Sequence, residues 1–176
     1  MLSCVRWPMR RHFVLTPGGH RINTLSPATN GAQSSSSSRS KPPLLLVHGF
    51  GGGVGLWAKN LDALSQHFEL HAIDLVGFGR SSRARLVARA DPGGEQAEQQ
   101  LVDSIEHWRQ AMGLDKMVLL GHSFGGYLVG AYALRYPDRV THLVLADPWG
   151  MVEAPLVSPL DTMPLSRRLL FGTLVK

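Results

Sequence analysis

Apolar residues gather in short runs that are separated by longer amphipathic segments. Short runs rich in apolar residues predict strands. The run at residues 44–47 holds no polar position, as expected for a strand covered on both faces. The predicted strands are residues 44–47, 70–75, 116–120 and 141–146. Apolar residues spaced three or four positions apart predict helices over residues 57–68, 95–112 and 124–136. The alternation of strands and helices predicts an α/β fold with a doubly wound, mostly parallel sheet.

The first part of the chain has a different pattern. Apolar-rich runs at residues 12–15 and 21–25 flank the sequence TPGG (16–19), which is typical of a hairpin because glycine accepts the positive φ angles of tight turns. Residues 26–43 contain five consecutive serines and three prolines, so they predict an exposed, flexible loop. A hairpin followed by this loop therefore precedes the strand at residues 44–47.

Length and composition limit the architecture further. A chain of 176 residues with 44% hydrophobic and 18% charged residues is typical of one packed domain and not of a disordered chain. Residues 1–150 are predicted to form the N-terminal part of one core, and residues 151–176, where the periodicity is lost, the start of a cap or lid. No apolar run is long enough to predict a membrane-spanning helix. The single cysteine, Cys4, excludes a disulfide framework and a cysteine-built zinc site.

The net charge of +5 is unevenly distributed. Residues 1–61 carry seven Lys or Arg and no acidic residue, whereas the remainder is slightly acidic. Nucleic-acid binding is not predicted, because the basic residues become sparse in the part of the chain where most strands and helices are predicted. Arg6, Arg10 and Arg11 are interpreted as a solvated face or as contacts to anionic lipid headgroups. A mitochondrial transit peptide is the alternative, and it conflicts with the predicted hairpin because cleavage would remove the hairpin.

A candidate nucleophile follows the predicted strand at residues 116–120. The sequence Gly121-His122-Ser123-Phe124-Gly125 matches the pattern G-x-S-x-G and lies between a strand and a helix. In this context the pattern predicts a sharp turn that projects the Ser123 hydroxyl above the sheet, with glycines where side chains would collide with neighbouring elements. The alternative is an ordinary glycine-rich turn.

A second glycine-rich loop, HGFGGG (48–53), follows the first predicted strand. A nucleophilic serine needs N–H donors where the tetrahedral intermediate develops negative charge, and we assign the amides of Phe50 and Phe124 to this role. His48, Gly49 and Gly51 would support the loop. The alternative is a phosphate-binding loop, but the sequence lacks the Lys-Ser or Lys-Thr ending of a P-loop.

Together these two loops resemble those of the α/β-hydrolase superfamily. The resemblance extends to a subgroup that contains a lyso-N-acylphosphatidylethanolamine lipase and a lipid-droplet coactivator of triglyceride lipase. It rests on the stretches HGFGGGVGLW (48–57), DLVGFGRSSR (74–83), SIEHWRQAMGLDKMVLLGHSFGGYL (104–128) and YPDRVTHLVLADPWG (136–150). The coactivator branch carries Asn where this chain has Ser123, so the resemblance implies the hydrolytic branch. It also implies no metal, no organic cofactor, a lipid partner, and a cytoplasmic location with lipid-droplet or mitochondrial association.

The rest of a catalytic triad is not found. The superfamily places the acid and the histidine on loops after strands seven and eight, and the sequence is expected to lack both strands. Asp147, after the sixth predicted strand, is the one substitute acid, although a turn role is the competing interpretation. His142 and Asp147 match His-x-x-x-x-Asp, but their spacing in a strand places them on opposite faces.

Four further residues near these loops are predicted to have structural roles. His122 is expected to point away from the Ser123 hydroxyl, and His48 to order its loop and not to accept a proton. Asp74 and Ser81 are interpreted as turn residues.

Three functions remain open at this point. The first is a serine hydrolase of the lipase or phospholipase type that cleaves ester bonds of lysophospholipid or N-acyl phospholipid through an acyl-enzyme on Ser123. The second is a shortened, catalytically inert form that binds lipid or a protein partner, since the strand at residues 141–146 is expected to form an unpartnered sheet edge. The third is acyl transfer to lysophosphatidic acid, although the motif associated with it is absent from its expected place.

Overall fold

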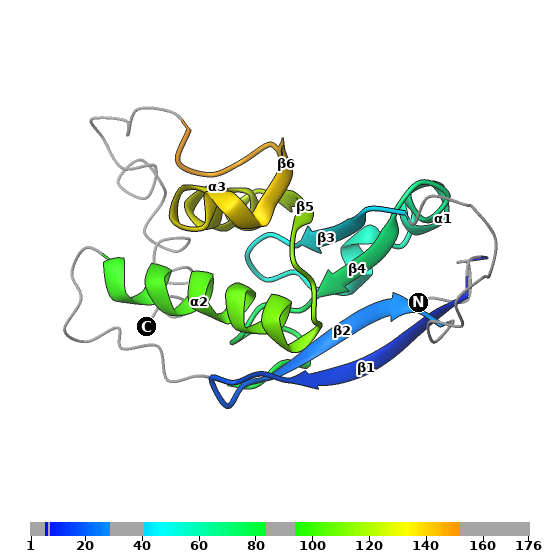
Figure 1. The fold of residues 1–176 in the computed structure, drawn as a ribbon. Coiled ribbons are helices and arrows are strands. Elements are labelled where there is room, and N and C mark those ends of the chain that lie inside the picture. Colours follow the sequence, from blue (N-terminus) through cyan, green and yellow to red (C-terminus); the bar gives the residue numbers. More distant parts are fainter. Residues whose placement is uncertain (1–5, 7, 29–40, 84–93, 152–176) are drawn as a thin grey trace, which may run out of the picture.

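The computed structural model describes residues 6, 8–28, 41–83 and 94–151, which form one six-stranded sheet with helices on both faces (Figure 1). The strands are β1 (Met9–Leu15), β2 (Arg21–Pro27), β3 (Pro43–Val47), β4 (Glu69–Ile73), β5 (Met117–His122) and β6 (Val140–Ala146). The helices are the 3₁₀ turns η1 (Val54–Trp57) and η2 (Pro137–Arg139) and the α-helices α1 (Leu61–Ser65), α2 (Glu95–Ala111) and α3 (Phe124–Arg135).

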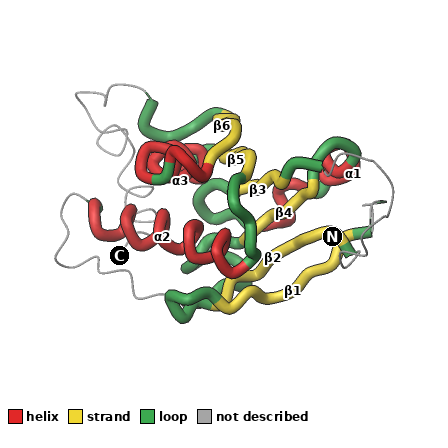
Figure 2. Tube along the Cα trace, viewed as in Figure 1, coloured by secondary structure: helices red, strands yellow, loops and turns green. Residues whose placement is uncertain are grey.

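The sheet has the strand order β1-β2-β4-β3-β5-β6. Strands β4, β3, β5 and β6 run parallel, whereas β1 and β2 form an antiparallel hairpin that joins the sheet through β4 (Figure 2). β3 lies between β4 and β5, and the four leucine and valine residues that end it are buried. The predicted α/β class and mostly parallel sheet are confirmed, and so is the hairpin.

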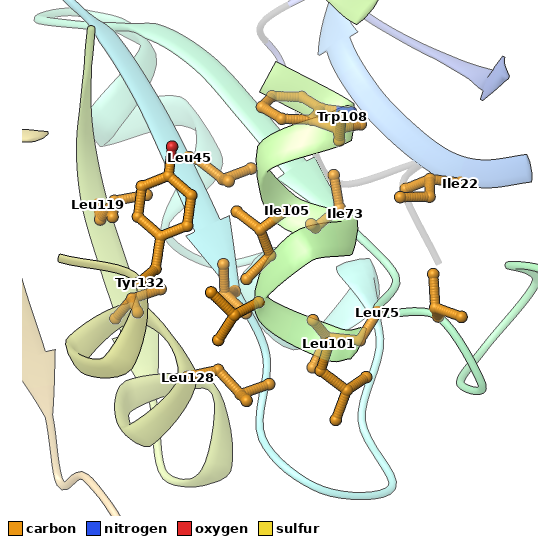
Figure 3. Packing of buried hydrophobic residues seen from close by; sticks show 14 of the residues in the cluster. Ile22, Leu45, Ile73, Leu75, Leu101, Ile105, Trp108, Leu119, Leu128 and Tyr132 are labelled. Carbon is orange, nitrogen blue, oxygen red and sulfur yellow. The ribbon is translucent and has the colours of Figure 1, made fainter. Parts of the chain in front are cut away.

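Both faces of the sheet are covered by apolar contacts. On one face, α2 and α3 pack against the strands, and Ile105, Trp108 and Leu128 are among the fully buried side chains (Figure 3). The Trp108 ring N–H donates a 3.0 Å hydrogen bond to the Thr24 hydroxyl on β2. On the other face, η1 and α1 contribute Trp57 and Leu61 to a smaller cluster. The amphipathic spacing in residues 95–112 is thus explained by packing.

Two expected elements differ from the structure. The helical spacing in residues 57–68 corresponds to two short pieces, η1 and α1, because the backbone N–H of Asn60 closes a turn onto the carbonyl of Trp57. The hairpin strands are longer than their apolar runs, since backbone pairing continues to Met9 and Pro27. Most of the predicted serine-rich loop and all but the first residue of the predicted cap segment lie outside the described residues. No described helix is both long and apolar enough to cross a membrane.

A buried ionic network fixes α2 against α3. The carboxylate of Glu106 accepts two hydrogen bonds from the Arg109 guanidinium, at 2.6 and 2.9 Å, and one of 2.6 Å from the Tyr132 hydroxyl. Burial by itself raises the pKa of Glu106, but the hydrogen bonds from Arg109, Tyr132 and Gln110 outweigh it and lower this pKa to about 2. Arg109 also donates to the carbonyl of Leu114, just before β5. The network therefore helps to hold α3, the helix that follows Ser123, against the sheet.

We expect the buried histidine of β4 to make the fold less stable as the pH falls. His71 is 2% exposed, and burial, with a smaller effect of His12, lowers its pKa to about 4. In the unfolded chain this pKa lies near 6.5, so below pH 6.5 the unfolded state binds a proton that the folded state excludes. The free energy of unfolding should fall by about 2 kcal/mol between pH 7 and pH 5.

Urea unfolding at both pH values measures this effect. The neighbouring groups on the packed elements are the Ser26 hydroxyl, which contacts Nδ1 at 2.9 Å, the Glu69 carboxylate, 3.5 Å from Nε2, and the Trp108 ring. A His71→Gln variant should lose most of the pH dependence, whereas the exposed control His67→Gln should keep it. An equal slope in both variants would show that another group is responsible.

Candidate active site

Ser123 lies in a tight turn between the end of β5 and the start of α3. Its backbone angles are φ 53° and ψ −121°, a combination that side-chain-bearing residues rarely adopt. A Cβ atom at Gly125 would overlap the carbonyl oxygens of Val47 and His48, and one at Gly121 would overlap the carbonyl oxygen of Gly125. Gly125 is therefore required for the close approach of the turn to β3, and Gly121 for the close approach of β5 to α3. The geometry is that of the strained strand-to-helix turn predicted from G-x-S-x-G.

The loop after β3 lies directly against this turn. A Cβ atom at Gly49 would lie 3.1 Å from the Cβ of Ser123, so the two loops are in van der Waals contact. Among the described residues, neither the N–H of Phe50 nor that of Phe124 donates a hydrogen bond. The amide of Phe124 also belongs to the first turn of α3, where the helix dipole favours negative charge. These properties suit an oxyanion hole, and the assignment of the two amides stays a prediction.

His48 is committed to the structure of its own loop. The side chain is fully buried, its Nδ1 donates to the carbonyl of Gly49 at 2.7 Å, and its Nε2 accepts the N–H of Leu75 at 3.0 Å. Burial lowers its pKa, more than the Gly49 bond and the charge of Asp74 raise it. Both ring nitrogens are occupied, so His48 orders the loop, as expected, and does not supply a general base to Ser123.

Asp74 has a wider structural role than the turn role predicted for it. The side chain is 3% exposed, and its carboxylate accepts hydrogen bonds from the N–H of Val54 at 2.7 Å, the N–H of Arg80 at 2.8 Å and the Asn23 amide at 2.8 Å. Ser81, also buried, donates to the Asp74 carbonyl at 2.6 Å. Asp74 thus joins the loop after β3, the loop after β4 and β2. A carboxylate can do this because three N–H donors replace its lost hydration.

Aromatic rings surround the turn at Ser123, and no role was predicted for these rings from the sequence. Phe50 is 61% exposed and Trp149 is 55% exposed, and their rings lie nearly parallel with centroids 6.3 Å apart. The ring of Phe124 lies 5.6 Å from that of Trp149, and the ring of Phe78 lies 5.4 Å from that of Phe50. The N–H of Trp149 donates to the carbonyl of Ser123 and so fixes the loop after β6 to the turn. The stretch DPWG, which is part of the family resemblance, could have identified Trp149 from the sequence.

No general base contacts Ser123 within the described part of the chain. The Ser123 hydroxyl makes no hydrogen bond there. Asp147 follows β6, is exposed and has a φ of 48°, which suits its interpretation as a turn residue. His142 lies on β6, four residues before Ala146, the residue whose carbonyl accepts the N–H of Ser123. His122 is partly buried, and its Nδ1, 3.1 Å from a Cβ built at Gly49, has no hydrogen-bond partner among the described residues.

Metal binding finds no support in the described ranges. No three His, Cys, Asp or Glu side chains within them are placed to hold a metal ion.

A mostly parallel sheet with a strained serine turn at the carboxyl end of a central strand defines the class of α/β hydrolases. The chain belongs to the alpha/beta hydrolase fold family, whose pattern it matches over residues 42–171. It is 50% identical over 155 residues to the mouse protein named 1-acylglycerol-3-phosphate O-acyltransferase ABHD5, covering 88% of this chain and 41% of the relative. It is 46% identical over 157 residues to the human (lyso)-N-acylphosphatidylethanolamine lipase, covering 88% of this chain and 42% of the relative.

Solved structures share the fold. A bacterial membrane phospholipase A is 28% identical, with a TM-score of 0.67 over 84% of this chain and 42% of that one. The naproxen esterase of Bacillus subtilis is 20% identical with a TM-score of 0.67, which shows the common fold alone. The predicted family and subgroup are thus confirmed. The chain spans about two fifths of the length of these two curated relatives.

Proposed function

We propose that this protein is a serine hydrolase that cleaves carboxylic ester bonds of lysophospholipid or N-acyl phospholipid through an acyl-enzyme on Ser123. The observation that carries the proposal is the strained backbone of Ser123, held by glycine contacts against the loop after β3. Strain at a single non-glycine residue is typical of a functional site, because folding alone would favour a relaxed turn. The free amides of Phe50 and Phe124 support the same reaction.

The reaction begins when the Ser123 oxygen attacks the ester carbonyl carbon and the hydroxyl proton passes to a general base. The carbonyl oxygen becomes negative and accepts hydrogen bonds from the two amides. When the C–O bond breaks, the alcohol leaves with the proton, and the acyl group remains on Ser123. Water then attacks the acyl-enzyme, which releases a fatty acid and restores the serine. No described residue contacts Ser123 as this base.

The lipid substrate class rests on two supports. The first is the kinship to a lipase for N-acylphosphatidylethanolamine at 46% identity. The second is the exposed pair Phe50 and Trp149 beside Ser123, which offers an apolar surface to an acyl chain. A fluorophosphonate probe tests the nucleophile directly: labelling that depends on Ser123 supports hydrolysis, and a folded protein that resists the probe contradicts it.

Acyl transfer would begin from the same acyl-enzyme. It differs only in the second step, where the hydroxyl of lysophosphatidic acid replaces water as the acceptor. The name of the mouse relative supports this alternative, but no described residue distinguishes an acceptor hydroxyl from water. Release of free fatty acid in the presence of lysophosphatidic acid, with no diacyl product, would favour hydrolysis.

The second candidate function is binding of a protein partner without turnover, and the outer edge of the sheet favours it. β6 is the edge strand of the described sheet, and Val144 and Leu145 on it are 39% and 36% exposed. A hollow of about 730 Å³ lies beside this edge, between α2, α3 and β6, and includes Leu134 and Met151. An edge strand with exposed apolar side chains is a site for association.

We therefore expect residues 1–176, expressed alone, to self-associate or to need a partner. Val144→Lys should raise the monomeric fraction, because a charge in place of an exposed apolar side chain on an edge strand opposes pairing. Thr141→Lys, at the start of the same strand, is the control with the same added charge. Size-exclusion chromatography with light scattering measures the outcome. A monodisperse monomer that melts cooperatively without any substitution would count against the binding function.

The setting that we propose is lipid metabolism at a lipid droplet or mitochondrial surface, reached from the cytoplasm. The lipid substrates named for the curated relatives support it. Fractionation of cells that express the protein tests each location, and recovery solely in the soluble fraction would contradict both.

A further inference from the structure

One face of the β1–β2 hairpin carries positive charge and apolar side chains that the proposed reaction does not use. Arg11, Phe13 and Leu15 share this face, since successive side chains of a strand point to opposite sides. β2 places Arg21 opposite Leu15 and Asn23 opposite Phe13. The Arg21 guanidinium lies 4.5 Å from the centre of the Phe13 ring, which keeps the cation on the same face. The hairpin lies at the edge of the described sheet opposite β6 (Figure 1).

A hollow of about 600 Å³ adjoins this face. Arg11 and Asn23 line it from the hairpin, residues 51–56 line it from the loop after β3, and Asp74 and Arg80 line it from the loop after β4. The lining includes five glycines, so backbone amides are not screened by side chains there. The hollow thus begins one residue after Phe50, on the loop that contacts Ser123.

The two guanidinium groups of the hollow are not paired with other groups of the protein. Within the described residues, the guanidinium groups of Arg11 and Arg80 have neither an ion pair nor a hydrogen bond. The one carboxylate there, Asp74, already accepts three N–H donors. Asn23 is 1% exposed, and its Oδ1 is a buried acceptor without a partner. The hollow therefore offers two free cations to a ligand that carries an anion.

Apolar side chains project beside these cations. Phe13 is 46% exposed, Leu15 is 73% exposed, and Leu56 at the hollow is 48% exposed. The first 61 residues contain no acidic side chain, so no carboxylate of the hairpin opposes an anionic surface. Basic residues combined with protruding apolar residues are the pattern by which proteins bind the interface of anionic membranes.

We propose that this face binds the phosphate of an anionic phospholipid headgroup at a bilayer surface. Arg11 and Arg80 contact the phosphate in the hollow, and Phe13, Leu15 and Leu56 enter the interface. In this orientation the loop of residues 48–56, and with it the rim of the Ser123 site, faces the membrane. The inference goes beyond the proposed reaction and does not depend on turnover.

Co-sedimentation with vesicles tests the site in a Ser123→Ala background, where the lipid cannot be consumed. Binding is expected to vesicles of phosphatidylcholine that contain phosphatidic acid, to weaken with added salt, and to be weak for phosphatidylcholine alone. The double variant Arg11→Gln, Arg80→Gln should weaken binding about tenfold or more. Leu56→Ser should lower the part of the binding that survives at high salt, because that part depends on apolar insertion.

The matched control removes the same charge elsewhere. Arg10 lies on the same strand but on the opposite face, and Arg135 lies on α3. The double variant Arg10→Gln, Arg135→Gln should keep most of the binding, and thermal melting confirms that both double variants are folded. An equal loss in both would show attraction by net charge alone and would overturn the site. Equally tight binding of inorganic phosphate or glycerol 3-phosphate, free in solution, would show a small-anion site and would overturn the membrane assignment.

Discussion

Replacement of Gly125 by alanine is expected to lower the free energy of unfolding by at least about 3 kcal/mol, or to prevent folding. The new Cβ would overlap the carbonyl oxygens of Val47 and His48 and would lie 2.8 Å from the carbonyl carbon of Val47. These are backbone atoms of β3 and its loop, so no side-chain rotation relieves the overlap. The start of α3 would have to move away from the central strand. Urea unfolding monitored by circular dichroism measures the loss.

Gly130 is a matched control on the same helix. A Cβ there would meet only the terminal carbon of Met151, at 3.9 Å. Gly130→Ala should therefore be neutral or stabilise the protein by up to about 1 kcal/mol, because alanine favours a helix more than glycine does. Similar destabilisation by both substitutions would show that α3 tolerates no added methyl group and would remove the special role of Gly125.

The architecture could be predicted because its signals are local and strong. Residues 44–47 form a buried strand because they contain no polar position, and the stripe that includes Ile105 and Trp108 predicts a buried helix face. Boundaries were harder to predict. The extension of β1 to Met9 depends on backbone pairing with Pro27, which apolar spacing does not encode. The helical segment is interrupted between Trp57 and Leu61, but both side chains are buried. The apolar spacing is therefore the same as in one continuous helix, and it does not reveal the interruption.

The candidate site could be predicted only where glycine marks a close approach. Gly121 and Gly125 identified the turn at Ser123, and the structure explains both by backbone contacts. The role of Asp74 could not be predicted, because its three donors come from segments far apart in the sequence. Trp149 is likewise brought to Ser123 by the pairing of β5 with β6. Contacts of this kind appear only when the sheet order is known.

Removal of the Ser123 side chain is expected to abolish the proposed chemistry and, for one variant, to stabilise the fold. Ser123→Ala and Ser123→Gly should each lower the rate of fluorophosphonate labelling at least about a thousandfold, since no other group replaces the nucleophile. At φ 53° and ψ −121°, glycine relieves strain that alanine retains. Ser123→Gly should therefore raise the free energy of unfolding by about 1 kcal/mol relative to Ser123→Ala.

Labelling kinetics of the protein at its full natural length, combined with urea unfolding, separate the two effects. Ser65→Ala is the control, because Ser65 is buried and its hydroxyl has no partner among the described residues; labelling should persist in this variant. Persistent labelling of Ser123→Ala would place the nucleophile elsewhere and remove the basis of the hydrolase proposal. Loss of stability in Ser123→Gly relative to Ser123→Ala would show that the turn is not strained. The strain at Ser123 is what connects the fold to the proposed chemistry, because a serine at a position where glycine would be more stable is typical of a functional site.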